Sequence, residues 1–478
     1  MARFLRSAGS TFLERPMGSV AAGLVLATLV AMAGCSGSAS DQPNIVVVVL
    51  DTVRDDVSAL ADEALPDPMP AMSSLAEDGT TFTNAWATAP WTLPSHASMM
   101  TGRLSSAHLC TGHSPILRPE LPTFAELLSG SGYEAVAFFS NPWLTDEMSG
   151  VMRGFRSWYV EARGDDRIHA MGGSQGGSAS NGNIERWLDE REPDRPFLLF
   201  VNYLETHLPY DPSPDVRTER LSDLAQNDIV STRWAYEFNA GVHDAAAVDW
   251  NRINRLYVGD AATSDALLGE LVAMLDARGL YDDTVIIVTS DHGENLGDYG
   301  LMDHQFGVFE TLLAVPLVVR APELLKPGLR DDPVMLTDLF STVLEVAGAA
   351  GPGELPHARS LLRAPADPDR PLIAEYAGGR PALVERLLEM NPDLDASAYA
   401  TAYSSVRVGN LRLTVGSDGS HRLDDFATQA DEMLDLETEG RAAAEVLKAL
   451  LPAVVPRARD IEVSEELEEE LRSLGYMP

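Results

Sequence analysis

Five predominantly apolar runs, separated by helical patterns, predict the core of this chain. The first run, residues 45–50, combines β-branched residues with leucine and has no polar position. A run that is apolar throughout is typical of a strand buried on both faces. The other apolar runs are residues 135–139, 197–203, 285–289 and 315–319. Helical patterns lie between them, over residues 121–131, 183–190, 248–278 and 334–347. This alternation predicts an α/β fold with a large, mostly parallel sheet flanked by helices.

The pattern changes from about residue 373 onward. Short alternating runs over 400–408, 411–415 and 421–423 predict strands, and the turn sequence 416–419 joins the last two as a hairpin. We expect a small C-terminal subdomain of three or four antiparallel strands, with helices over 441–451 and 464–474. Two segments of the larger part are less regular. Residues 164–183 are rich in Gly, Ser and Asn and predict a surface loop, and residues 211–249 predict an irregular insertion.

The N-terminus has the pattern of an export signal. Three arginines precede an apolar run over residues 20–33, and the run leads into Met32-Ala33-Gly34-Cys35. Small residues before the cysteine are typical of a bacterial lipoprotein signal, so we expect an exported protein of the cell envelope, anchored to the membrane through lipidated Cys35. An uncleaved anchor and a plain secretory signal are the alternatives. The predicted parts are a signal and lipobox over residues 1–35, a tether over 36–42, an α/β domain over 43–372 and a subdomain over 373–478.

Composition narrows the classes of partner and ligand. The 478 residues include 72 acidic and 35 basic side chains, a formal net charge of −37. Such a charge repels phosphate backbones, so we expect no nucleic acid partner. An acidic, solvated surface explains the charge without any further function. With only two cysteines, Cys35 and Cys110, a disulfide framework is excluded, and a metal site must use oxygen and nitrogen ligands.

Acidic side chains follow two of the predicted strands. Asp51 comes directly after the first apolar run, and Asp291-His292 follows the run over 285–289. In open α/β sheets, ligands bind at the carboxyl ends of the strands, where a divalent cation would offset carboxylate repulsion. Considered alone, Asp51 is explained more simply as a helix N-cap. Asp291-His292, considered alone, is explained more simply as a turn whose polar groups are hydrogen-bonded. Taken together, they favour a metal site.

A hydroxyl residue, Thr92, stands just before a helix that is predicted to begin at Pro94. The free N–H groups and the positive dipole end of a helix favour an anionic ester at this position. A neutral threonine is a poor nucleophile, but it ionises more readily as a ligand of a divalent cation, so Thr92 is itself a candidate metal ligand. The segment therefore predicts a metal-activated nucleophile.

Several ordered segments resemble the signatures of the sulfatase family, within the alkaline phosphatase superfamily. The resemblance runs from residue 43 to the C-terminus and implies an alkaline phosphatase-like fold. It makes Thr92 the nucleophile and Asp51, Asp291 and His292 metal ligands. The segments that carry it are Pro43-Asn44-Ile45 through Asp51-Thr52-Val53-Arg54, Thr92-Leu93-Pro94-Ser95-His96 through Gly102-Arg103, residues 202–210, residues 280–294, residues 297–317 and residues 465–476.

The same resemblance implies roles for further basic residues. His207 and His304 fall where the family places groups that bind the ester oxygens or protonate the leaving group. Arg103 and His108 fall where family members keep basic residues around the anion. A helix C-terminal charge explains Arg103 equally well, and a surface loop position explains His108 equally well.

Departures from the usual sulfatase pattern bear on the chemistry. Sulfatases typically carry a cysteine or serine that becomes formylglycine, with arginine four residues on, whereas this chain has Thr92 and His96. Threonine cannot form that aldehyde, so no formylglycine is expected. Thr52 replaces a second metal-binding aspartate, and His292 stands where asparagine is common. Nitrogen ligation shifts the expected metal from Ca towards Zn or Mn. The site resembles threonine-using phosphatase, phosphodiesterase and phosphoethanolamine-transferase branches of the superfamily.

These observations predict a metal-dependent hydrolase that cleaves a sulfate or phosphate/phosphonate ester through a covalent Thr92 intermediate. Two alternatives remain open at the level of sequence. One is a phosphoethanolamine-type transferase of the cell envelope, although such relatives usually carry transmembrane helices and disulfides that this chain lacks. The other is a catalytically silent binding protein on the same fold.

Overall fold

The computed structural model describes residues 42–61, 67–160, 175–225, 227–363, 367–427, 432–433 and 440–452. The predicted export signal, nearly all of the tether and the predicted helix over 464–474 lie outside these residues. In the described part of the chain, no helix has both the length and the apolar character needed to cross a membrane.

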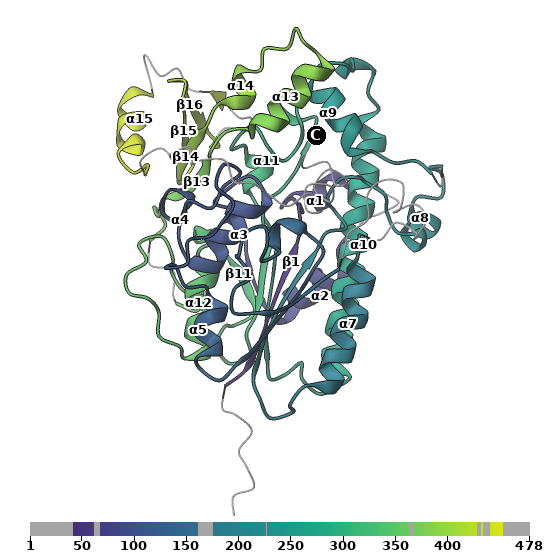
Figure 1. Ribbon diagram of the computed structural model, residues 1–478, viewed down its shortest axis with the longest axis vertical. Coiled ribbons are helices and arrows are strands. Elements are labelled where there is room, and N and C mark those ends of the chain that lie inside the picture. The colour runs from purple at the N-terminus through teal and green to yellow at the C-terminus, as the bar shows by residue number, and fades with distance from the viewer. Residues whose placement is uncertain are drawn as a thin grey trace, which may run out of the picture. The chain divides into compact units, whose positions relative to one another are not determined.

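The centre of the structure is an eight-stranded sheet built around the first apolar run (Figure 1). β1 (Asn44–Leu50) is buried along its whole length and pairs in parallel with β6 and β7. Within this sheet, only β10 is antiparallel to its neighbours, β7 and β2. The predicted mostly parallel sheet is therefore confirmed. In spatial order the strands are β11 (Gly328–Arg330), β2 (Thr80–Phe82), β10 (Leu317–Arg320), β7 (Thr284–Thr289), β1, β6 (Phe197–Tyr203), β4 (Glu134–Phe139) and β5 (Arg156–Tyr159).

Helices cover both faces of the sheet, as the apolar residues Ile45 to Leu50 of β1 require. Successive side chains of a strand point to opposite faces. Ile45, Val47 and Val49 belong to one core cluster, and Val46, Val48 and Leu50 belong to the other. The first cluster includes residues of α3 (Thr92–Thr101), α5 (Phe124–Ser129) and α12 (Asp338–Ala347). The second includes residues of α2 (Pro70–Asp78), α7 (Gly177–Glu190) and α10 (Trp250–Asp276).

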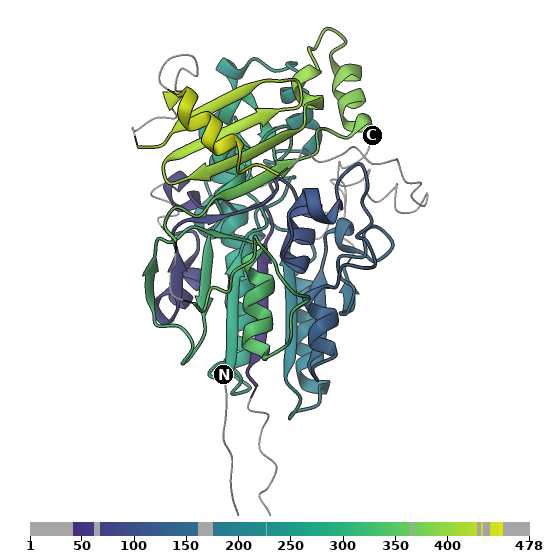
Figure 2. The same cartoon turned by 90° about the vertical axis from the view of Figure 1, so that its left-hand side faces the viewer.

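A second, antiparallel sheet forms the C-terminal part (Figure 2). It has five strands rather than three or four, because β13 precedes the predicted strands and a short β17 follows them. The predicted hairpin over 416–419 is confirmed, since β15 and β16 pair across it. Val406, Leu413 and Leu423 share a core cluster with the large sheet. The elements are β13 (Leu372–Tyr376), β14 (Tyr403–Val408), β15 (Leu411–Gly416), β16 (His421–Asp425), β17 (Glu432–Met433) and α15 (Arg441–Lys448).

Three element boundaries differ from the prediction. α7 begins at Gly177, inside the predicted loop, because Asn181 is buried and bonded to Tyr203 and α10. α12 begins only at Asp338, because the preceding apolar residues form β12 and pair with β3. α3 begins at Thr92 rather than at Pro94. In each case tertiary contacts override local preference.

The segment 211–249 contains two helices and is more regular than predicted. Ser213 and Ser231 cap them through their hydroxyl oxygens. The remaining short elements are α1 (Val57–Leu60), β3 (Ala85–Trp86), α4 (Ser105–His108), η1 (Pro142–Leu144), α8 (Pro214–Arg220), α9 (Thr232–Asn239), η3 (Ala245–Ala247), β8 (Asn295–Leu296), η4 (Asp298–Gly300), β9 (Met302–Asp303), α11 (Glu310–Leu313), β12 (Val334–Met335), α13 (Pro381–Met390) and α14 (Ser397–Ala400).

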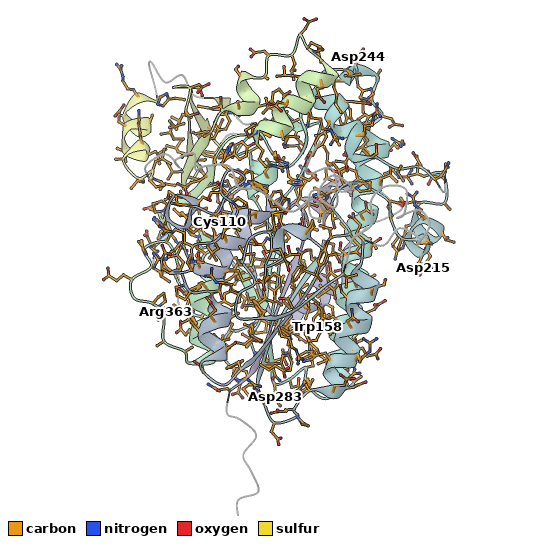
Figure 3. The ribbon with its side chains drawn as sticks, in the orientation of Figure 1. Cys110, Trp158, Asp215, Asp244, Asp283 and Arg363 are labelled. Atoms are coloured by element: carbon orange, nitrogen blue, oxygen red, sulfur yellow. The ribbon has the colours of Figure 1, made fainter. Side chains whose placement is uncertain are left out.

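Many acidic side chains lie on the surface, and the one described cysteine lies inside. Asp215, Asp244 and Asp283 are exposed at the periphery of the view in Figure 3. Cys110 is buried and unpaired, and burial raises the pKa of its thiol. This cysteine is therefore a packing residue with little thiolate character.

Candidate active site

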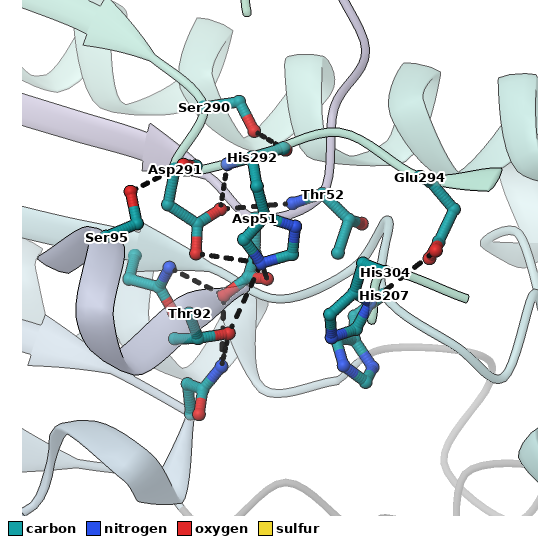
Figure 4. A network of polar contacts seen from close by, with 12 residues as sticks. Asp51, Thr52, Thr92, Ser95, His207, Ser290, Asp291, His292, Glu294 and His304 are labelled. Atoms are coloured by element: carbon teal, nitrogen blue, oxygen red, sulfur yellow. Dashed lines mark hydrogen bonds and ion pairs between the residues drawn. The ribbon is translucent and has the colours of Figure 1, made fainter. Parts of the chain in front are cut away.

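The carboxyl ends of β1 and β7 bring the predicted metal ligands together (Figure 4). Val49 lies opposite Thr289 in the two paired strands, so both chains leave the sheet at the same edge. Asp51, Asp291 and His292 follow directly and are fully buried. Each offers one ligand atom, and these atoms all lie within 4.8 Å of one another. His292 Nε2 is 3.3 Å from Asp291 Oδ2 and 4.0 Å from Asp51 Oδ1.

This cluster has the donors that a divalent cation requires. Asp51 Oδ1 and Asp291 Oδ2 are buried without a hydrogen-bond partner. The Nδ1 atom of His292 lies 2.9 Å from the Gly293 carbonyl oxygen, to which it donates as Nδ1–H. In the neutral ring, Nε2 then presents its lone pair to the carboxylates, as in a metal-ligating histidine. The donor set of two oxygens and one nitrogen fits Zn or Mn better than Ca.

The two carboxylates have different electrostatic surroundings. Burial raises the pKa of Asp51, and the charge of Asp291 raises it further. Burial also acts to raise the pKa of Asp291, but His292 and His96 outweigh it and hold that pKa below its usual range. Burying two carboxylates whose only charged partners are histidines costs free energy unless a further positive charge is present. A cation between them removes this cost.

Thr92 is the first residue of α3 and points into the cluster (Figure 4). Its Oγ1 lies 3.5 Å from His292 Nε2 and accepts a hydrogen bond from Asn141 Nδ2 at 3.3 Å. Trp91, the N-cap residue, provides no side-chain cap for the first turn of the helix. The N–H groups and dipole of this turn therefore favour negative charge at Thr92. The Ser95 hydroxyl fixes α3 to the ligand loop by donating to the Asp291 carbonyl at 2.6 Å.

His96 lies in α3, one helical turn after Thr92. Its Nδ1 is 2.9 Å from the Thr92 carbonyl oxygen and 3.4 Å from Asp291 Oδ2. The ring is fully buried and packs edge-on against Phe200. The structure therefore brings His96 to the cluster as a residue that orients Asp291.

His207 and His304 lie together beside the cluster (Figure 4). The His304 ring is 4.9 Å from the ring of His207 and 4.5 Å from that of His292. Burial, together with the neighbouring His304, lowers the pKa of His207 to about 3. Burial also opposes a charge on His304, but Asp303 and Glu294 outweigh it and raise its pKa well above the ordinary value. His207 is therefore the neutral ring of the pair, and His304 is the ring that favours a bound proton.

Two predicted residues are not brought to the cluster. Arg103 follows the C-cap Gly102, at the opposite end of α3 from Thr92, and a ten-residue helix rises about 15 Å. His108 uses both ring nitrogens away from the site, with Nδ1 accepting from the Cys110 N–H and Nε2 lying 3.1 Å from Ser98 Oγ. Its fully buried ring is also not in the surface loop considered for it. We therefore assign Arg103 to the helix end and His108 to internal packing.

Four residues of the site were not assigned from the sequence. Asn141 and Asn202 each donate to Asp51 Oδ2 at 3.0 Å. Glu294 and Asp303 flank His304. The strand-end argument that identified Asp51 applies equally to Asn141, which follows β4 by two residues. Asn202 near the end of β6 and Glu294 just after Asp291 also lie at strand ends, whereas the contact of Asp303 with the site depends on how the following loop packs.

The alkaline phosphatase-like fold and this site define a hydrolase that acts on ester bonds. A model of the sulfatase family matches residues 43–349, which is more than half of the chain, and the chain belongs to this family. A "Sulfatase" of Formosa agariphila is 23% identical, with 86% of this chain and 87% of that protein covered. A "Choline-sulfatase" of Rhizobium meliloti is 25% identical, with 70% of this chain and 74% of that protein covered.

Solved structures show the same fold. The phosphonate monoester hydrolase of Agrobacterium radiobacter superposes with a TM-score of 0.65 at 21% identity, covering 86% of this chain and 94% of that one. A protein solved in complex with its substrate D-glucosamine-2-N,6-O-disulfate also gives a TM-score of 0.65, at 18% identity, covering 91% and 98%.

Proposed function

We propose that this protein hydrolyses a sulfate or phosphate/phosphonate ester through a covalent intermediate on Thr92, with a divalent cation held by Asp51, Asp291 and His292. The observation that carries the proposal is the position of Thr92 Oγ1, 3.5 Å from His292 Nε2 and hydrogen-bonded to Asn141. Similarity to proteins named as sulfatases and as a phosphonate monoester hydrolase supports both classes of ester.

The cation, when bound, would supply positive charge that favours loss of the Thr92 hydroxyl proton to solvent and offsets the negative charge of the ester. Asn141 donates to Thr92 Oγ1 and orients it for attack. As the bond from Oγ1 to phosphorus or sulfur forms, the bond from that atom to the alcohol oxygen breaks. His207 or His304 delivers a proton to the leaving alcohol.

The second step restores the threonine. Water attacks the phosphorus or sulfur atom, its protons pass to the histidine and to Thr92 Oγ1, and the bond to Oγ1 breaks. Inorganic sulfate or phosphate, or the free phosphonate, is released. A formylglycine adduct can instead expel sulfate by breaking its own C–O bond, and threonine has no such route. The intermediate must therefore open at phosphorus or sulfur, which favours a phosphate or phosphonate ester.

Thr92→Ala tests the nucleophile. We expect loss of turnover on aryl sulfate, phosphate monoester, diester and phosphonate substrates, with metal content unchanged because the three other ligands remain. Acid quenching of the wild type during turnover should leave a phosphorylated or sulfated Thr92, detectable by peptide mass spectrometry. Thr101→Ala is the matched control, since Thr101 lies in the same helix and its hydroxyl bonds only to the Ala97 carbonyl. Unchanged turnover in Thr92→Ala contradicts the assignment.

We also propose that Cys35 carries the lipid anchor of an exported envelope protein. The support is the sequence from the N-terminal arginines to Cys35. Labelling with palmitate and extraction into detergent tests this, with Cys35→Ser as the control. A mature protein that begins at a different residue contradicts it.

A further inference from the structure

A second group of potential metal ligands lies next to the first. Glu294, Asp303 and His304 each offer one ligand atom, and these atoms lie within 4.8 Å of one another. His304 Nδ1 is 2.8 Å from Asp303 Oδ1 and 3.5 Å from Glu294 Oε1. All three residues are at most 3% exposed. These two separations of 2.8 and 3.5 Å fit a Zn ion, whose bonds of about 2.0–2.2 Å to nitrogen and oxygen place neighbouring ligand atoms about 3–3.5 Å apart.

Hydrogen bonding leaves part of this group unsatisfied. Neither carboxylate oxygen of Glu294 has a hydrogen-bond partner, although the side chain is fully buried. His304 Nδ1 lies 2.8 Å from Asp303 Oδ1, whereas His304 Nε2 has no hydrogen-bond partner. Buried carboxylates normally accept several hydrogen bonds. Glu294 therefore lacks the partner that its burial demands.

The charges of the two groups lead to the same conclusion. Asp51, Asp291, Glu294 and Asp303 are four buried carboxylates, and in the described structure their only ion pairs are with histidines. Arg54 does not neutralise them, because it pairs with Asp56 and Asp298 at 2.7 Å and meets Glu294 only at its backbone oxygen. One divalent cation balances two of these carboxylates. The other two belong to the second group, where a proton on His304 offsets only one of them.

The two groups also have the same composition. Asp291-His292 joins Asp51 in the first, and Asp303-His304 joins Glu294 in the second. The rings of His292 and His304 are 4.5 Å apart, so the groups are neighbours. An Asp-His pair with one further carboxylate thus occurs twice at the same edge of the sheet.

We propose that Glu294, Asp303 and His304 hold a second divalent cation beside the first. Its chemical role rests on the proposed function. A pair of neighbouring cations can stabilise both the attacking and the leaving oxygen of an in-line displacement. The second ion would replace the charge of a protonated His304 and would stabilise the leaving oxygen in its place. Substrates with two non-bridging oxygens free to contact both ions, such as phosphate and phosphonate monoesters, fit this arrangement.

Metal stoichiometry tests the proposal without an activity assay. Purified protein is loaded with Mn²⁺, passed through gel filtration in physiological salt to remove ions from the acidic surface, and analysed by elemental mass spectrometry. We expect two ions per wild-type chain and one in Glu294→Gln and in Asp303→Asn. Electron paramagnetic resonance should show a coupled pair in the wild type and isolated ions in both variants. The matched control is Glu375→Gln. It makes the same substitution at an equally buried carboxylate, which accepts a hydrogen bond from the Ser106 N–H.

The outcomes separate this inference from the proposed function. One ion in the wild type, lost in Asp291→Asn but kept in Glu294→Gln, overturns the second site and leaves the first. No retained ion in the wild type overturns both. Circular dichroism confirms that the variants are folded, and retention of one ion by Glu294→Gln shows in itself that the neighbouring group is intact.

Discussion

Two asparagines bind the same carboxylate oxygen, and only one of them also contacts Thr92. Asn141 and Asn202 both donate to Asp51 Oδ2 at 3.0 Å, and Asn141 Nδ2 also lies 3.3 Å from Thr92 Oγ1. We predict that Asn141→Ser lowers kcat, whereas Asn202→Ser mainly weakens cation binding. Serine is too short to reach Asp51 from either position. At position 141 it keeps an oxygen that can cap the turn, where Asn141 Oδ1 now accepts from the Trp143 N–H.

The magnitude follows from the bond that is lost. A hydrogen bond to a charged group is worth about 1.5–3 kcal/mol. If the bond to Thr92 strengthens as its oxygen becomes negative, its loss should lower kcat by roughly 10- to 150-fold, at about 1.4 kcal/mol per factor of ten. Both variants lose one bond to Asp51, so their cation affinities should fall by similar factors.

Steady-state kinetics at saturating cation is the appropriate assay, combined with a cation titration for each variant. Saturation removes the shared effect on Asp51 and leaves only the contact with Thr92. An equal loss of kcat in Asn141→Ser and Asn202→Ser, or unchanged kcat in Asn141→Ser, would refute the role of Asn141 in positioning the nucleophile.

Two further predictions concern stability. Chelation should lower the melting temperature, since a cation at one hundred times its Kd stabilises the folded state by about 2.7 kcal/mol per site. Thermal melts with and without chelator measure this effect, and the melting temperature of Asp291→Asn should change less than that of the wild type. Burial raises the pKa of Glu375 from 4.5 to about 7. The folded state therefore holds this proton more tightly, and the resulting stability is complete below pH 4.5 and is lost as the pH rises to about 7. The loss is roughly 3 kcal/mol, so denaturant melts of Glu375→Gln should show a flatter pH dependence, and parallel curves would contradict this.

Local patterns in the sequence were enough to predict the large sheet. Residues 45–50 have no polar position, so the strand has to be covered on both sides, and the structure places helices on both faces. Asp51 and Asp291 each follow a predicted strand, and adjacent parallel strands end at the same edge of the sheet. The sequence therefore also predicted that these two side chains lie close together. The start of α7 was missed because contacts of Asn181 with β6 and α10, rather than local preference, stabilise that turn.

The sequence by itself predicted the α/β architecture, the sulfatase-family resemblance and the candidate nucleophile with its three candidate ligands, since apolar periodicity and strand-end chemistry are local properties. The tertiary structure alone decided which other polar groups reach the site. Asn141 contacts Asp51 because β4 lies beside β6, which lies beside β1. Arg103 is kept away by the length of α3, and Glu294 meets His304 through the turn between β8 and β9. Strand order and packing set these distances, and no local pattern encodes them.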